Sequence, residues 1–175
     1  MLQITNATTE EHFDQTRQLI AEMARWDGEQ SQQLGLDPQE VAEFFYSSDD
    51  EALRRESAFP AGSLLLATFA EVPAGCAAFR RIDENACELY NVYVRDRFRG
   101  KRIGRRMVEQ LVATARHVGY SAMRLETTPF MLEAQALYAS IGFRSRGPYR
   151  AVPKTFEPWT VFMELALAAP GVSEG

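Results

Sequence analysis

The chain has 175 residues, 46% of them hydrophobic and 25% charged, which is typical of a globular protein long enough to bury a core. Its formal net charge of -5 argues against a broad basic surface for nucleic acid. Two cysteines, Cys76 and Cys87, are too few for a disulfide scaffold, and no stretch approaches the ~20 apolar residues of a membrane span. The N-terminus lacks a basic region followed by an apolar run, so we expect a cytoplasmic protein with reduced thiols.

The N-terminal part predicts one short strand followed by a helix. Residues 2–6 have strand character, and Thr8 with Glu11 forms a Thr-x-x-Glu capping box at the start of the helix. The apolar spacing predicts that this helix ends near residues 26–28. The polar, Gln-rich segment at residues 29–35 is expected to be a loop.

A second helix is expected to begin at Asp37 and Pro38, because these residue types favour the N-cap and the first turn of a helix. Its buried face would carry Val41, Phe44 and Phe45. The acidic run that follows, residues 47–56, is expected to be partly helical.

The middle of the chain predicts three antiparallel strands. Residues 63–70, 76–82 and 86–94 have strand character, and turn-forming stretches at residues 72–75 and 83–85 separate them. Strands joined by such short turns are neighbours in one antiparallel sheet.

The second half of the chain alternates helices with strands. A helix from Ile103 to about residue 117 leads to a strand at residues 122–127, which we expect to be parallel to the strand before that helix. Pro129 and Gly142 bound a further helix. The remaining strands are expected to start at Phe143 and to span residues 160–167, on either side of a loop at residues 147–158. We therefore predict one mixed α/β domain over residues 1–168, with a frayed tail at residues 169–175.

A basic loop, residues 99–105, joins the strand at residues 86–94 to the next helix. A strand that breaks at the start of a helix leaves unpaired N–H groups at the positive end of the helix dipole, which favours phosphate binding. Gly100 and Gly104 allow the backbone to approach an anion closely. The loop does not fit G-x-x-x-x-G-K-[ST] or G-x-G-x-x-G, and a plain basic surface loop is the alternative interpretation.

The loop sequence RFRGKRIGRRM after a strand, together with AQALYASIGF downstream, resembles the GNAT superfamily of acyl-CoA-dependent N-acyltransferases. The resemblance covers about residues 64–143 and implies a twisted, mostly antiparallel sheet with a splayed parallel strand pair, flanked by helices. The family motif [RQ]-x-x-G-x-[GA] binds the pyrophosphate of acetyl-CoA. Arg102 stands where the motif has glycine, and a positive φ at this residue would be costly. The implied cofactor-binding residues of the loop are Arg99, Gly100, Lys101, Arg102, Ile103, Gly104 and Arg105.

The resemblance also implies that the pantetheine arm lies beside the strand at residues 86–94 like an extra strand. A bulge in this strand would aim a backbone N–H at the thioester carbonyl, and Val92 and Val94 are the backbone candidates. Family members often carry an asparagine that contacts the cofactor seven residues before the catalytic tyrosine. Met131 occupies that position here, so this contact is not expected.

Two side chains are candidates for acid–base chemistry. Glu88 stands where a glutamate of the family often serves as the base for the amine, and its alternative role is that of a solvent-facing strand residue. Tyr138 matches the family tyrosine that protonates the leaving thiolate, and its alternative role is packing between helix and sheet. Cys87 would point to the opposite face and belong to the core rather than act as a nucleophile.

The acceptor amine would bind across the sheet from the cofactor, beside the first two helices. Aromatic residues could line this site or belong to the core, and they are Trp26, Phe45, Tyr46, Phe130 and Tyr149. His12 and His117 lie far apart in sequence without ligand-spaced partners, so we expect no metal.

The predicted function is transfer of an acetyl or other short acyl group from acyl-CoA to a primary amine in a ternary complex. The acceptor would be a small-molecule or peptide amine, with no nucleic-acid or membrane partner, and a homodimer is an open option. One alternative is a non-catalytic acyl-CoA sensor or structural module. Another is nucleic-acid binding through Arg95, Arg97, Arg99, Lys101, Arg102, Arg105 and Arg106.

Overall fold

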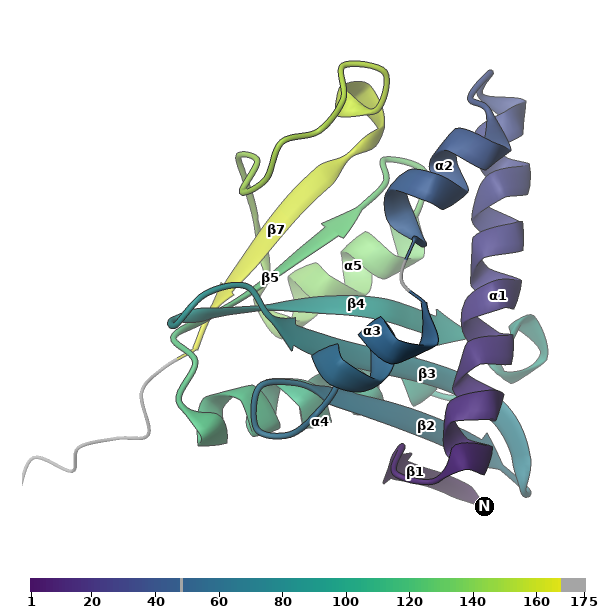
Figure 1. Ribbon diagram of the computed structural model, residues 1–175, viewed down its shortest axis with the longest axis vertical. Helices are drawn as coiled ribbons and strands as arrows, with labels where there is room; N and C mark the ends of the chain where they lie inside the picture. The colour runs from purple at the N-terminus through teal and green to yellow at the C-terminus, as the bar shows by residue number, and fades with distance from the viewer. Residues whose placement is uncertain (48, 168–175) are drawn as a thin grey trace, which may run out of the picture.

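The computed structural model describes residues 1–47 and 49–167, so the tail expected at residues 169–175 lies outside the described residues. Seven strands form one sheet in the order β1-β2-β3-β4-β5-β7-β6. Figure 1 shows that this sheet is twisted. The strands are β1 (Leu2–Asn6), β2 (Ser63–Phe69), β3 (Val72–Arg81), β4 (Ala86–Val94), β5 (Ala122–Thr127), β6 (Arg144–Arg146) and β7 (Val161–Ala166). The helices are α1 (Glu10–Gln33), α2 (Pro38–Phe45), α3 (Asp50–Glu56), α4 (Ile103–Val118) and α5 (Leu132–Ile141), with short 3-10 turns η1 (Asp96–Phe98) and η2 (Glu157–Trp159).

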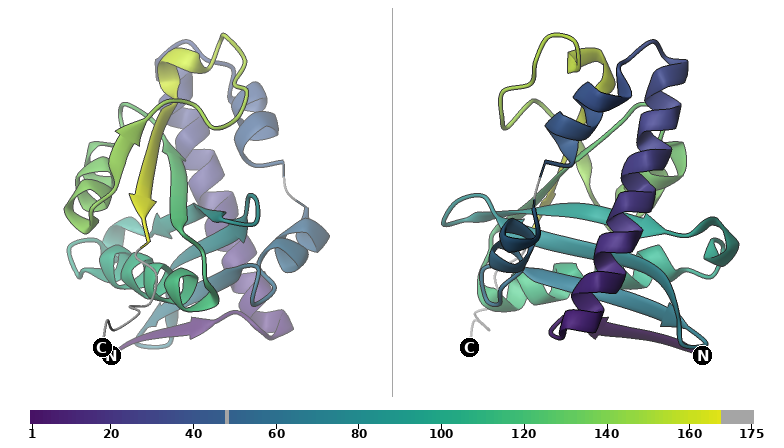
Figure 2. Two further views of the ribbon diagram at one scale, coloured as in Figure 1. Left: turned by 90° about the vertical axis from the view of Figure 1, so that its left-hand side faces the viewer. Right: turned by 45° about the vertical axis from the view of Figure 1, so that its right-hand side comes forward.

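Helices cover both faces of the sheet (Figures 1 and 2). On one face α4 buries an apolar stripe, from Ile103 to Ala115, against Leu65, Phe79 and Leu89 of the sheet. On the other face Leu19 of α1 packs on residues of the same sheet. The side chains of these residues point away from α4, because successive side chains of a strand alternate between the two faces. Cys87 belongs to the α4 side, as predicted, and Glu88 therefore points toward α1 and α2.

The predicted parallel pair is confirmed, and it is short. β4 pairs with β5 from Ala86↔Ala122 to Leu89↔Leu125 and no further, although both strands continue. Beyond this point β5 stays paired with β7 as far as Thr127↔Val161. Figure 1 shows β5 and β7 running obliquely away from β4. The two parallel strands are therefore splayed, and the second half of β4 has a free edge.

β4 also contains the predicted bulge. Its pairing with β3 shifts between Cys76↔Tyr93 and Ala78↔Tyr90, so two residues of β4, Asn91 and Val92, lie opposite a single residue of β3. Asn91 has φ 53, which is unusual for a residue other than glycine. The bulge re-aims the backbone of β4 at the point where the strands separate.

Two predictions for α1 were wrong. Thr9, rather than Thr8, is the N-cap, and its side chain accepts a hydrogen bond from the N–H of His12. The helix does not end near residues 26–28 but continues to Gln33. Glu and Gln are good helix formers, and a Cβ added at the glycine at position 28 would lie 3.4 Å from the Cβ of Pro38.

Two further boundaries were also placed wrongly. Residues 72–75 are part of β3 rather than a turn, and the reversal is made by Ala70 and Glu71, with φ 49 and φ 65. Helix α5 begins at Leu132, not at Pro129, because the chain first makes a turn in which the N–H of Met131 donates to the carbonyl of Thr128.

Candidate active site

The basic loop presents free backbone donors at the start of α4. Among the described residues, the N–H groups from Gly100 through Arg105 donate to no backbone carbonyl, and no side chain caps the helix. The N–H of Arg99 is already used by the carbonyl of Asp96, and regular helical bonding resumes with Arg106 donating to Arg102. Six consecutive amides are therefore available for an anion at the positive end of the α4 dipole.

The left-handed backbone conformation of the basic loop has a cost in free energy. Gly100 has φ 77 and Arg102 has φ 61, so both residues are left-handed. A non-glycine residue in this region costs about 1 kcal/mol. Arg102 therefore has the positive φ that is costly for a residue with a side chain. This cost explains why glycine suits this position of the motif.

The side chains of the loop are partly engaged within the protein. Arg99 donates from Nε to the carbonyl of Val94 at 3.2 Å and pairs with Asp96 at 3.0 Å. Arg105 pairs with Glu109 at 2.9 Å. Lys101 lies 5.1 Å from the centre of the Phe69 ring and is exposed. The backbone therefore supplies the main part of the candidate anion site, with exposed cations around it.

The other two loop positions are fixed by packing. Ile103 is buried in the core beneath the loop. A Cβ added at Gly104 would lie 3.6 Å from Leu137 and 3.7 Å from Val94, which is ordinary contact. The start of α4 is thus held against β4 and α5, and its amides are kept at the free edge of β4.

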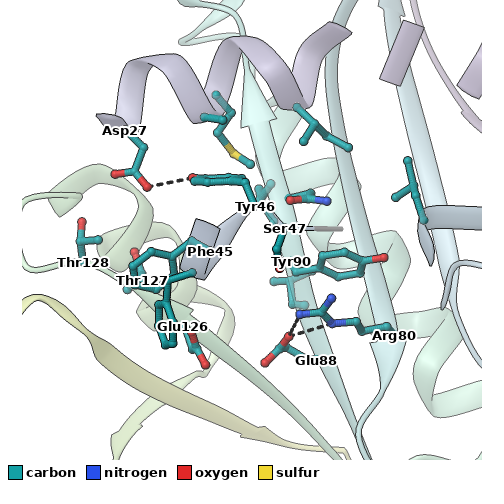
Figure 3. A pocket seen from close by; sticks show the side chains of 18 of the residues that line it. Asp27, Phe45, Tyr46, Ser47, Arg80, Glu88, Tyr90, Glu126, Thr127 and Thr128 are labelled. Atoms are coloured by element: carbon teal, nitrogen blue, oxygen red, sulfur yellow. Dashed lines mark hydrogen bonds and ion pairs between the residues drawn. The ribbon is translucent and has the colours of Figure 1, made fainter. Parts of the chain in front are cut away.

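A cavity of about 540 Å³ opens where β4 and β5 separate (Figure 3). α1 and α2 cover it on one side, and its lining continues over β4, β5 and α5, with further residues from β3, α3 and the segment that carries Arg150. Val92 of the bulge lies in its wall, whereas Val94 lies farther along the free edge and is outside the lining. The basic loop and this cavity are thus joined by the half of β4 whose edge toward β5 is free.

Glu88 lines the cavity and is only 7% exposed. Its Oε1 accepts hydrogen bonds from Nε and Nη2 of Arg80 at 3.0 and 2.7 Å, and its Oε2 accepts one from the Tyr149 hydroxyl at 2.7 Å. Arg80 is its direct cross-strand neighbour and also pairs with Glu56 at 3.0 Å. Glu88 is therefore not a solvent-facing strand residue but a fixed carboxylate in the cavity wall.

Tyr138 also lines the cavity, from α5, and is 6% exposed. Its ring packs edge-on to Phe143 at a centroid distance of 5.8 Å. Burial raises the pKa of its phenol, so the hydroxyl keeps its proton at neutral pH. The residue therefore combines the packing role with the state that a general acid requires.

The predicted acceptor residues fall into separate places. Tyr46 lines the cavity, and its hydroxyl donates to Oδ2 of Asp27 at 2.9 Å. Trp26 and Phe130 pack on one another at 6.4 Å and are outside the lining. Tyr149 lies behind Glu88, to which it donates. Phe45 lines the cavity beside Tyr46.

Of the charged residues in the cavity lining, sequence reasoning found only Glu88, and Asp27 and Arg80 are two of those that it missed. Asp27 follows buried Leu19 and Met23 at four-residue intervals, which places it on the buried stripe of α1 and could have revealed it. Arg80 carries no such signal, because only the register of β3 against β4 sets it opposite Glu88.

Cysteine and metal chemistry receive no support from the described residues. Both cysteines are buried, and burial raises the pKa of the Cys87 thiol to about 12, so it remains protonated. Within residues 1–47 and 49–167 there is no group of three or more His, Cys, Asp or Glu side chains that could hold a metal ion. Over the same residues, no helix has the length and apolar character needed to cross a bilayer.

Relatives and solved structures share this architecture. An uncharacterized N-acetyltransferase of Schizosaccharomyces pombe is 33% identical over 128 residues, which cover 71% of this chain and 77% of that protein. An IAA acetyltransferase of Azospirillum brasilense is 37% identical over 94 residues, or 53% of this chain and 60% of that protein.

Two crystal structures illustrate the similarity of fold. A GNAT-family acetyltransferase from Staphylococcus aureus superimposes with a TM-score of 0.73 at 16% identity, covering 96% of this chain and 100% of that one. A GNAT-family acetyltransferase from Elizabethkingia anophelis with acetyl-CoA bound has a TM-score of 0.59 at 16% identity, covering 95% and 98%. The sequence profile of the acetyltransferase (GNAT) family matches residues 21–143. The chain therefore belongs to the GNAT acetyltransferase family.

Proposed function

We propose that the protein transfers an acetyl or short acyl group from acyl-CoA to a primary amine by direct transfer in a ternary complex. The observation that carries the proposal is the run of six amides, from Gly100 through Arg105, that has no acceptor among the described residues. Such a run at a helix N-terminus suits a diphosphate. It lies at one end of the free β4 edge, and the cavity lies at the other.

The residues present fit acyl-CoA as co-substrate. The diphosphate would be held by the amides of the basic loop, with Arg99, Lys101 and Arg102 nearby as cations. The pantetheine arm would pair with the free edge of β4 as an added strand, using main-chain groups at Val92 and Val94. This arrangement would bring the thioester to the bulge, at the cavity wall.

The proposed chemistry uses two side chains and one backbone amide. A re-aimed amide of the bulge, with Val92 as the first candidate, would stabilise negative charge on the carbonyl oxygen. Glu88 would take the proton of the amine through a water molecule, and Tyr138 would protonate the departing sulfur. The assignment of Tyr138 as the acid rests on its place in the cavity lining and on a phenol that is protonated at neutral pH.

A thiol-release assay with acetyl-CoA against a panel of amines tests this proposal. Thiol release with at least one amine is expected, and it should fall in the Glu88→Gln and Tyr138→Phe variants while CoA affinity changes little. CoA-dependent thermal stabilisation without release from any amine would instead favour the acyl-CoA sensor. Oligonucleotide binding that CoA does not displace would favour the nucleic-acid alternative.

A further inference from the structure

The proposed chemistry leaves Asp27 without a role, although this carboxylate lies in the cavity. Asp27 is 4% exposed, and its Oδ1 has no hydrogen-bond partner among the described residues. Only two other buried side-chain atoms in that part of the chain lack a partner, the hydroxyls of Tyr90 and Thr128. Both residues also line the cavity. The unsatisfied polar atoms of the described interior are thus gathered where a ligand would bind.

The orientation of Asp27 is fixed by its one partner. The Tyr46 hydroxyl donates to Oδ2 at 2.9 Å, so Oδ1 is the oxygen left free for another donor (Figure 3). A buried polar atom that gains no hydrogen bond costs about 1–3 kcal/mol, and more when it is charged. Burial accordingly raises the pKa of the Asp27 carboxyl. A cationic donor at Oδ1 would supply the missing hydrogen bond and compensate the buried negative charge of Asp27.

The cavity itself has no spare cation for Asp27. Its lining contains five carboxylates, Asp27, Asp49, Asp50, Glu88 and Glu126, but only three guanidinium groups. Each guanidinium is already paired with another acid: Arg17 with Asp50, Arg80 with Glu88, and Arg150 with Glu126. The lining therefore carries an excess of negative charge, and Asp27 is its most buried unpaired member.

The cation at Asp27 cannot be the reacting nitrogen. A carboxylate that has no cationic partner of its own stabilises the charged form of a nearby ammonium group and raises its pKa, whereas attack on a thioester needs the neutral amine. Asp27 is such a carboxylate, whereas Glu88 is already paired with Arg80. Asp27 projects from α1 and Glu88 from β4, and Figure 3 shows the two carboxylates at separate places in the cavity. One molecule could thus place one nitrogen near Glu88 and a second charge at Asp27.

We propose that the acceptor is a dicationic amine, and that Asp27, held in place by Tyr46, pairs with the positive group that does not react. This inference rests on the proposed acyl transfer and defines the class of acceptor. The unpartnered hydroxyls of Tyr90 and Thr128 offer further polar contacts to such a ligand. Asp27 is then a specificity-determining residue, and Tyr46 positions it.

The test compares diamines with monoamines of equal chain length. Initial rates are measured with acetyl-CoA and putrescine or cadaverine, and with butylamine or pentylamine. We expect kcat/KM to be higher for the diamine by about tenfold or more, equivalent to about 1.4 kcal/mol. In Asp27→Asn this preference should disappear, mainly through a higher KM for the diamine. Glu29→Gln changes an exposed carboxylate on the same helix, outside the cavity lining, and should retain the preference.

Two results would overturn the inference while acyl transfer stands: no diamine preference in the natural protein, or the same preference in Asp27→Asn. Absence of thiol release with every amine would instead remove the proposed acyl transfer. In that case calorimetric titration of putrescine into the CoA-bound protein still decides the role of Asp27. Binding that Asp27→Asn weakens by about tenfold supports the cation site, and binding that is absent or unchanged refutes it.

Discussion

The basic loop and the cavity lie at two ends of one free strand edge, yet they are built differently. The loop consists of seven consecutive residues and offers its backbone, with left-handed residues at Gly100 and Arg102. The cavity is assembled from α1, α2, α3, β3, β4, β5, α5 and the segment that carries Arg150, and it offers side chains. A backbone site tolerates changes of side chain, whereas a side-chain site depends on each residue separately. We therefore expect that mutations can change co-substrate binding and acceptor selection separately.

The largest expected effect comes from the cavity. Tyr138→Phe removes the proposed acid but keeps the ring that packs on Phe143. We expect kcat to fall by about 100-fold, which is within the range for loss of a general acid. CoA affinity, measured by calorimetry, should stay within about twofold because the basic loop is untouched. A parallel loss of CoA affinity would show that the two regions are not separable.

A change in the basic loop should instead weaken CoA binding and leave the use of the amine little changed. Gly100→Ala places an L residue at φ 77, at a cost of about 1 kcal/mol that is relieved by moving the amides. We expect CoA affinity to weaken by about tenfold, with the KM of the amine little changed. Gly147→Ala is the matched control, since that glycine is exposed, has open space for a Cβ and has no left-handed φ. Equal effects of the two variants would contradict the assignment of the loop.

Asp27 provides a test through stability instead of activity. Burial raises its carboxyl pKa, so its contribution to stability is fully present below the ordinary carboxyl pKa and is lost as pH rises through the raised value. The Asp27→Asn variant has no carboxyl group at this position, so it does not lose stability in this way as the pH rises. Relative to the natural protein, the variant should gain unfolding free energy as the pH is raised from about 4 to about 8. Urea unfolding at both pH values measures the gain, and a pH-independent difference would argue against a strained carboxylate.

The smallest expected effect is in the loop again. Arg102→Gly relieves about 1 kcal/mol of left-handed strain, and the greater freedom of glycine in the unfolded chain offsets about half of it. We expect a net stabilisation of about 0.5 kcal/mol, with CoA affinity retained because the amide at this position remains. A thermal unfolding midpoint below that of the natural protein would indicate that the Arg102 side chain itself stabilises the loop.

The sequence determined those features that depend on neighbouring residues. The strand, loop and helix around Gly100, the antiparallel meander, the parallel strand β5 and the placement of Tyr138 on α5 follow from local spacing and short connections. The length of α1 did not, because its polar end is helical without a continuous apolar stripe. The roles assigned to Glu88 and Tyr138 stay predictions.

Only the tertiary structure decided which side chains surround the proposed reacting groups. The register of β3 against β4 sets Arg80 opposite Glu88, and a loop far along the chain brings Tyr149 to the same carboxylate. The packing of α2 on α1 joins Tyr46 to Asp27 and leaves one oxygen unpaired. These pairs connect residues that are distant in the sequence, so their charges and hydrogen bonds exist only once the chain has folded. Local pattern therefore predicts the candidate diphosphate site, whereas the proposed selection of an amine depends on contacts between separate elements.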